Sequence, residues 1–339
     1  MTSLALTRAQ ILAFRRGVSA LDERLPLSAA SLRRAAWAGL QDSMPRAAIL
    51  SIHARVQNIS PRVLDHPSLT QVWGPRFSAY VVAERDAAIF TLGRLPLDAE
   101  ERDSAILLAV RLHARLKGRR LGHTEAVRPL ELRHPNQIRY ATTSGRLRIR
   151  WEGAREPKLW TVPAPKIEPR AARLELARRY LHVFGPATPG SFAAWAGIDP
   201  ASGRSSFDAL ARSLTPVRTP TGDAWVLAGD EASFRAKPGP AAAARLLPSG
   251  DPYFLLHGAD RELLVPEARR RSALWTSRVW PGAVLVGGEV VGTWRRAGPL
   301  LTIEPWRRLS RKERDAVEAE AQSMPLPDVA GRIRVSWAG

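Results

Sequence analysis

Two runs of apolar residues at helical spacing flank a short polar segment near the start of the chain. The first run comprises Leu32, Ala35, Ala36 and Leu40, and the second comprises Ala48, Ile49, Ile52 and Val56. Such spacing predicts two amphipathic helices. Gln41, Asp42 and Ser43 lie between them and are followed by Pro45.

The polar segment has two interpretations. In the first it is a helix–helix turn, with Ser43 as N-cap of the second helix and Pro45 in its first turn, where a missing N–H costs nothing. In the second, Gln41, Asp42 and Ser43 are a catalytic cluster set between helices. Because polar residues are common at helix caps, the residue types alone favour the turn.

The chain after residue 95 changes from helical to alternating apolar spacing. A helix that starts after Asp98 or Asp103 and ends near Lys117 has Ile106, Val110 and Leu112 as core candidates. Three segments rich in strand-forming residues follow, with a turn at Ser144-Gly145; they are residues 137–143, 146–153 and 158–163. Together they predict an antiparallel sheet of two or three strands.

The middle strand of this predicted sheet alternates arginine with apolar residues. Arg146, Arg148 and Arg150 occupy one face, and the other face is apolar. Helices followed by a basic hairpin form a winged-helix pattern, in which these arginines, with Lys158 on the next strand, are candidate phosphate contacts.

A similar order of elements follows the proline-rich segment 163–169. Helices are predicted at residues 171–184, 190–197 (with Ser191 as a candidate cap) and 205–214, and then a hairpin that turns at residues 221–223. This repetition indicates a second winged helix. Its third helix is only weakly basic, so packing between domains and groove reading are both open.

The last hundred residues are predicted to be strand-rich after a second linker at residues 236–244. Short strands are expected within residues 282–306, a helix capped by Ser310 and Glu313 over residues 310–322, and a closing strand at residues 332–339. Arg295 and Arg296 follow Trp294 at a strand end; they are either a nucleic-acid contact or an ordinary solvated patch.

These patterns predict a helix-rich α+β fold of tandem winged-helix units with a small C-terminal β-rich element. The expected division is residues 1–165 for the N-terminal helical region and first winged helix, 166–236 for the second, and 237–339 for a third winged-helix-like unit with the β-rich element.

The charge of the chain points to a polyanionic partner. The formal net charge is +19, and all but five of the 51 basic residues are arginine. Nucleic acid is the default partner of such a chain, whereas a merely basic surface is the alternative.

Other residue types exclude several kinds of chemistry. With no cysteine, disulfides, thiolate metal sites and cysteine nucleophiles are excluded, and the seven scattered histidines form no metal-binding motif. We therefore expect no metal and no cofactor. No apolar run approaches the length of a membrane span, so we expect a cytoplasmic, nucleoid-associated monomer.

Four separated blocks of the sequence resemble the winged-helix DNA glycosylases of the AlkZ/YcaQ type. The blocks are AGLQDSMPRAAILSIHARV, ARRYLHVFGPATPGSFAAWAGI, RLLPSGDPYFLLHGADRELLVP and GAVLVGGEVVGTWRR, in the order found in that family. The resemblance implies three winged-helix units around a DNA-sized channel. It also implies excision of alkylated or crosslinked purines from double-stranded DNA by water attack at the sugar C1′.

The catalytic motif of that family is Gln, any residue, then Gln or Asp. Gln41 matches the first position, and Ser43 stands at the second, with Asp42 between them. The resemblance therefore makes Gln41, Ser43 and Asp42 the candidate catalytic residues. An alkylated purine is a cationic leaving group, so a positioned water and stabilisation of the developing charge suffice for the reaction.

A second hypothesis is a winged-helix protein that binds DNA without catalysis, in a regulatory or damage-protective role. Ser43 favours it, since a hydroxyl is a poor base near neutral pH. A third is sequestration of a DNA-damaging metabolite. Strand cleavage with alkali after incubation with N7-alkylguanine DNA distinguishes the first two.

Overall fold

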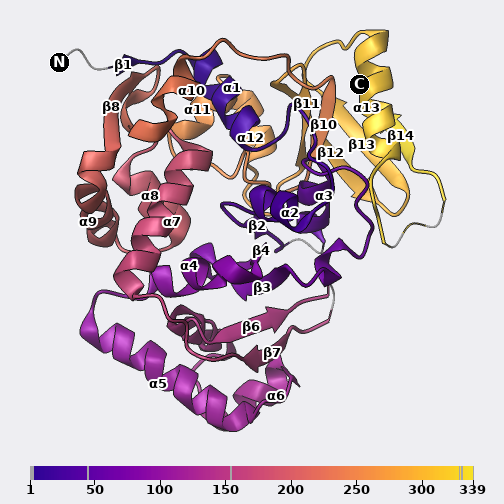
Figure 1. Cartoon of the computed structure of the whole chain (residues 1–339). Helices are drawn as coiled ribbons and strands as arrows, with labels where there is room; N and C mark the ends of the chain where they lie inside the picture. Colours follow the sequence, from indigo (N-terminus) through magenta and orange to yellow (C-terminus); the bar gives the residue numbers. More distant parts are fainter. Residues whose placement is uncertain (1–3, 44–45, 153–154, 328, 330, 339) are drawn as a thin grey trace.

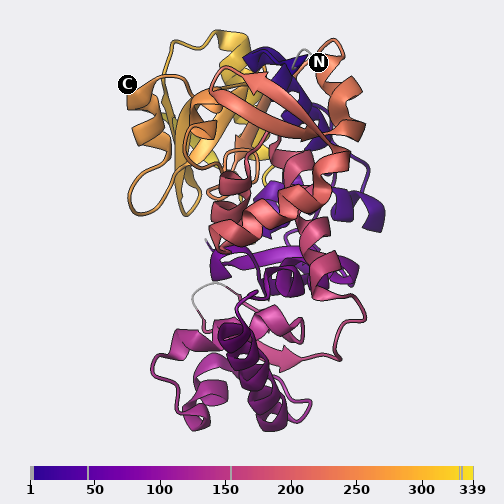
Figure 2. The ribbon, with the colours of Figure 1, turned by 90° about the vertical axis from the view of Figure 1, so that its left-hand side faces the viewer.

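The protein has a helix-rich α+β fold, as predicted, in a computed structural model that describes residues 4–43, 46–152, 155–327, 329 and 331–338. Residues 99–152 and 155–161 form one end of the molecule, and α1 (Arg8–Val18) and α13 (Arg311–Gln322) lie toward the opposite end (Figures 1 and 2). Among the helices that the structure describes, none has the length and apolar character needed to cross a bilayer.

The sheet that carries Gln41 has the strand order β2-β4-β3-β6-β7-β5. Its strands are β2 (Leu40–Gln41), β3 (Leu69–Trp73), β4 (Ala79–Ala83), β5 (Leu121–Gly122), β6 (Leu147–Arg150) and β7 (Lys158–Thr161). Around it lie α2 (Ala29–Ala35), α3 (Ala47–His53), α4 (Ala87–Thr91), α5 (Ala99–Leu116) and α6 (His123–Val127). Every residue of β4 is buried, because α2 and α4 pack against this strand.

Short 3-10 helices connect many of the elements. They are η1 (Val63–Asp65), η2 (Pro75–Phe77), η3 (Glu84–Asp86), η4 (Leu92–Arg94), η5 (Arg128–Leu130), η6 (Pro135–Ser144), η7 (Ala211–Ser213) and η8 (Ala228–Asp230).

The strand expected at residues 137–143 is wrong, because this segment is helical in η6. Its buried residues Ile138, Ala141 and Thr142 recur at i, i+3 and i+4, and η6 packs along α5. The β-branched residues of the segment suggested a strand, but its apolar positions follow helical spacing. The antiparallel pairing of β6 with β7 is confirmed.

The core face of α5 also differs from the prediction. Asp98 is its N-cap and Lys117 its C-cap, as expected. Leu112 is buried, but Ile106 is 41 % exposed and Val110 48 % exposed. The buried stripe consists of Ala105, Ala109, Leu112 and Leu116. Small alanines let α5 approach η6 closely, and this leaves the larger aliphatic side chains outside.

The second unit has the order helix, helix, helix, hairpin. It consists of α7 (Pro169–Phe184), α8 (Pro189–Ala196), α9 (Pro200–Leu210), β8 (Leu214–Thr219) and β9 (Gly222–Leu227). Thr188, not Ser191, is the N-cap of α8, while the Ser191 hydroxyl accepts a bond from the Thr188 N–H.

The N-terminal segment packs away from the unit to which the sequence assigned it. Strand β1 (Leu4–Ala5) pairs in parallel with β8, and α1 (Arg8–Val18) packs on α7, α10 (Glu231–Arg235) and α11 (Asp260–Leu264). The three-part division of the chain stays a prediction, but this contact crosses its first boundary.

The C-terminal sheet has the order β10-β11-β12-β13-β14. Its strands are β10 (Ala244–Leu247), β11 (Gly282–Val286), β12 (Glu289–Ala297), β13 (Leu300–Pro305) and β14 (Arg334–Trp337), and the accompanying helices are α12 (Ala268–Leu274) and α13 (Arg311–Gln322). The hairpin glycines Gly287 and Gly288 have φ of +57° and +86°, which suits a two-residue turn. The predicted capping box of Ser310 and Glu313 is confirmed.

The helical assignment of η6 makes a stability prediction. Ile138 is fully buried, so Ile138→Ala should lower the free energy of unfolding by about 2–5 kcal/mol. The matched control Ile106→Ala, on the exposed face of α5, should change it by about 0.5 kcal/mol or less. Urea denaturation of both variants measures the difference, and equal losses would contradict the packing described.

Candidate active site

Gln41 ends the short strand β2, and Asp42 and Ser43 follow it directly. The side chains of Gln41 and Ser43 are hydrogen-bonded to each other, whereas Asp42 binds Gln71 on the other side. Gln41 in β2 is paired with Tyr80 of β4, and the Asp42 N–H continues the ladder by donating to the Ala79 carbonyl at 2.8 Å. Successive side chains of an extended strand point to opposite sides. The segment is therefore a strand end, not the helix–helix turn that the sequence favoured.

Asp42 is the residue that binds the start of α3. Its side chain is buried; Oδ1 accepts from the Ala48 N–H at 3.0 Å, and Oδ2 accepts from Gln71 Nε2 at 2.7 Å. Burial raises the pKa of Asp42 to about 7, although both donors favour the charged form. The expectation that Ser43 caps α3 is wrong, and Pro45 lies outside the described residues.

The amide of Gln41 is held at both ends. Its Nε2 donates to Ser43 Oγ at 3.0 Å, and its Oε1 accepts from Arg76 Nη2 at 3.4 Å. Because a guanidinium can only donate, the amide oxygen must face Arg76. Arg76 therefore fixes the orientation of the Gln41 amide.

Arg76 also donates, through Nη1, to His257 Nε2 at 2.9 Å. This bond requires an unprotonated Nε2. Burial, together with the charges of Arg76 and Arg261, lowers the pKa of His257 to about 4, so its imidazole is neutral at pH 7. Both of these acceptors are neutral, so they leave the positive charge of Arg76 uncompensated.

The loop that carries Arg76 is held by a buried arginine from elsewhere in the chain. Arg94 donates to the carbonyls of Gly74 and Ala196, the latter at 2.7 Å, and its guanidinium carbon lies 4.3 Å from the centre of the Phe77 ring. Burial lowers the pKa of Arg94 to about 9, so it stays charged at neutral pH. The loop is thereby tied to the end of α8.

Gly197, at the end of α8, allows this contact. A Cβ at Gly197 would lie 2.8 Å from the Arg76 Cα. Arg76 and Phe77 themselves have positive φ values of 53° and 54°, a region that costs side chains energy. The surrounding contacts therefore impose an unfavourable backbone so that Arg76 reaches Gln41.

A third segment covers Gln41 from the C-terminal unit. A Cβ at Gly250 would lie 3.3 Å from Gln41 Cδ, and Gly250 has φ +78°. The next residue, Asp251, forms a fully buried pair with Arg55 at 2.7 and 2.8 Å. Three segments far apart in the sequence, residues 41–43, 74–77 and 250–257, thus meet at one amide.

The chain matches a model of the AlkZ-like DNA glycosylase family over residues 32–325, a span that includes all three segments. It belongs to this family. The interstrand DNA cross-link repair glycosylase of Streptomyces sahachiroi is 29% identical over 226 residues, which cover 58% of this chain and 60% of that relative. The chain therefore spans less than two thirds of that relative.

A solved structure supports the shared fold. The DNA glycosylase AlkZ of Streptomyces sahachiroi matches with a TM-score of 0.78 at 20% identity, covering 99% of this chain and 100% of that one. Identity at this level shows the fold alone, so the roles of individual residues in this AlkZ-like chain are argued from its own contacts.

The predicted DNA-binding arginines of β6 do not form a free basic row in this AlkZ-like chain. Arg148 is buried and paired with Glu84 at 3.1 Å, and half-buried Arg150 pairs with Asp65 and Glu152. The expectation of a solvent-facing arginine face is wrong for Arg148, because its buried guanidinium is already paired with the Glu84 carboxylate.

The other predicted contacts keep an accessible charge. Lys158, Arg295 and Arg296 are exposed, and Arg146 is half-buried. Arg295 donates to the Val279 carbonyl, and Arg296 to the Gly298 carbonyl. Their contact with DNA stays a prediction.

Sequence reasoning missed Arg76, Arg94, His257 and Gly250. The Trp73-Gly74-Pro75-Arg76 segment carried a turn signal, and Gly250 and His257 fall within a quoted family block. No spacing rule connects them with Gln41, because the contacts are made across three elements of the fold.

The depressed pKa of His257 predicts a pH effect on stability. The unfolded imidazole takes up a proton near pH 6.5 and the folded one only near pH 4, so acidification through this range favours unfolding, by at most about 1.4 kcal/mol per pH unit. His257→Gln should therefore lose less stability than the wild type between pH 6.5 and 4.

Guanidinium denaturation at a series of pH values measures this difference. The raised pKa of Asp42 makes the folded state more stable on acidification, which opposes the effect of His257. Because wild type and His257→Gln both retain Asp42, the difference between them reports on His257. His113→Gln, at an exposed histidine, should keep the wild-type slope. A parallel pH dependence of His257→Gln and wild type would show that His257 is not buried in its neutral form.

Proposed function

We propose that this chain is a DNA glycosylase that hydrolyses the N-glycosidic bond of alkylated purines in double-stranded DNA. Its membership of the AlkZ-like family supports the glycosylase reaction. The name of the Streptomyces sahachiroi relative, an interstrand DNA cross-link repair glycosylase, supports crosslinked bases as further substrates. The observation that carries the proposal is the Gln41 amide, fixed by Arg76 next to the Ser43 hydroxyl.

Gln41 and Ser43 hold the attacking water in this proposal. The carbonyl oxygen of Gln41 keeps a lone pair free beside its bond to Arg76, and the Ser43 hydroxyl can donate or accept. Two such groups on the same side of a strand orient one water with little reorganisation.

The reaction balances without a metal, a cofactor or a protein nucleophile. The water oxygen forms a bond to C1′ as the C1′–N bond breaks, and the bonding electrons neutralise the positive ring of the alkylated base. The extra proton of the water passes to solvent. Because the base leaves as a neutral molecule, no general acid is required.

We assign Asp42 a positioning role rather than a direct one. Its carboxyl group is directed away from Gln41 and Ser43 and binds Ala48 and Gln71. Since Gln71 also binds the backbone of Trp151, Asp42 connects the catalytic strand to the rest of its sheet. It supports the pose of Gln41 without contacting the sugar.

Removal of the Gln41 amide tests the proposal. Gln41→Ala should lower the single-turnover excision of N7-methylguanine from duplex DNA by about 100-fold or more, since the water loses its acceptor. Alkaline cleavage at abasic sites gives the rate. The matched control Gln57→Ala, at an exposed glutamine, should keep the wild-type rate.

DNA binding must be measured alongside excision. If wild type and Gln41→Ala bind the duplex equally and neither excises the base, the glycosylase proposal fails and the non-catalytic DNA-binding alternative is supported. Ser43→Asp places a carboxylate at the second motif position, and it should raise the excision rate by stabilising the cationic transition state.

A further inference from the structure

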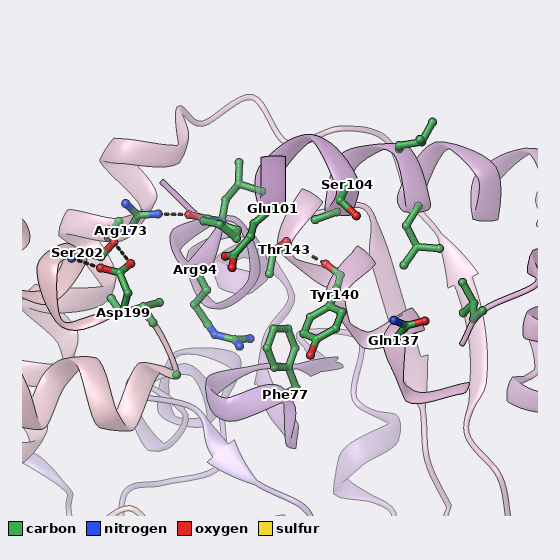
Figure 3. A pocket seen from close by; sticks show the side chains of 18 of the residues that line it. Phe77, Arg94, Glu101, Ser104, Gln137, Tyr140, Thr143, Arg173, Asp199 and Ser202 are labelled. Atoms are coloured by element: carbon green, nitrogen blue, oxygen red, sulfur yellow. Dashed lines mark hydrogen bonds between the residues drawn. The ribbon is translucent and has the colours of Figure 1, made fainter. Parts of the chain in front are cut away.

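A cavity of about 530 Å³ lies between α5, η6 and the turn that joins α8 to α9 (Figure 3). Its wall is mixed: Phe77, Leu108 and Ile198 are apolar lining residues, and Glu101, Gln137 and Asp199 are polar ones. This size and this mixture are typical of sites for small organic groups. Gln41, Asp42 and Ser43 are not among the residues that line this cavity.

Aromatic rings form one side of the cavity. Phe77 and Tyr140 meet edge to face, with ring centres 4.8 Å apart and planes at 90°. Arg94 lies over the Phe77 ring and holds it in place. Tyr140 is 50 % exposed, and Leu107 at the cavity is 60 % exposed, so large apolar surfaces are available to a flat ligand.

A second cavity of about 380 Å³ adjoins the first. The two share Leu95, Pro96 and Arg173, and Arg102 and Arg170 line the second one. Arg170 is exposed at the start of α7. Arg102 is half-buried, and its Nε lies 3.5 Å from a carboxylate oxygen of Asp103. Aromatic rings beside arginines are the combination that binds single-stranded nucleic acid, through base stacking and phosphate contact.

We propose that these adjoining cavities bind one nucleotide unit of a single-stranded DNA segment. The base packs against Tyr140 and Phe77, and its phosphate pairs with Arg102 and Arg170. The inference rests on the proposed function in taking DNA as the partner. It adds a contact for an unpaired nucleotide, made by residues other than those that hold the water.

The loop of residues 74–77 connects the two sites. Arg76 orients Gln41, and Phe77, the next residue, lines the cavity. Gly197 packs against the Arg76 backbone and also lines the cavity. A nucleotide bound here therefore contacts the loop that sets the position of Gln41.

Fluorescence anisotropy with a labelled 12-nucleotide single strand tests the proposal. Tyr140→Ala should weaken binding at least about fivefold, since a stacked base contributes that much or more. The control Leu27→Ala, at a similarly exposed apolar residue, should not change the affinity. Arg170→Ala should weaken binding and lower its salt dependence, compared with Arg311→Ala at the exposed start of α13.

A strand without bases separates stacking from charge. On an abasic strand of the same length, Tyr140→Ala and wild type should bind equally. Competition by dAMP would assign the site to the nucleotide itself, and competition only by an unlabelled strand would assign it to the DNA chain; both support the proposal if they depend on Tyr140.

Equal affinity of Tyr140→Ala, Leu27→Ala and wild type for the strand with bases would overturn the inference. If the chain is not a glycosylase, the experiments give a different result from the one that overturns the nucleotide site. In that case the wild type would excise no base, yet the loss on Tyr140→Ala would persist, and it would also be seen in the Gln41→Ala background.

Discussion

The candidate site depends on buried arginines that donate to backbone carbonyls. Arg94 holds the loop of Arg76 to the end of α8, and Arg15 holds the end of α7 by donating to the carbonyls of Phe184 and Gly185. A guanidinium presents several donors in a rigid plane, so one side chain can bind carbonyls from two segments. Removal of either arginine would leave buried carbonyls without a hydrogen-bond donor, which would lower the free energy of unfolding.

This use of arginine changes the meaning of the high positive charge. A net charge of +19 suggests a surface covered with phosphate contacts. Arg55, Arg94 and Arg148 are instead buried, and they bind a carboxylate or carbonyls of the same chain. Part of the basic composition thus holds the fold together, and only the exposed remainder is available to DNA.

The overall plan was predictable from the sequence because it depends on local signals. Ser310 with Glu313 marked the start of α13, and Gly287-Gly288 marked a hairpin, through contacts within a few residues. The segment in η6 was misassigned because its β-branched residues outweighed its helical spacing.

The site was predictable only in part. Gln41 and Ser43 were identified by resemblance, but Ser43 was expected to cap the second helix, and it is the Asp42 carboxylate that binds the start of α3. An expected helix end turned out to be a strand, where side chains alternate. Arg76 and His257 lie 35 and more than 200 residues from Gln41, and only the packed structure brings them together.

In the proposed mechanism, Arg76 acts on the reaction through the Gln41 amide. The most direct test is a double-mutant cycle on the single-turnover rate of N7-methylguanine excision, with Arg76→Met, Gln41→Ala and the double variant. If the claim holds, Arg76→Met lowers the wild-type rate, but it has no further effect once Gln41 is alanine. Losses that multiply in the double variant, or a wild-type rate no higher than that of Gln41→Ala, would contradict it.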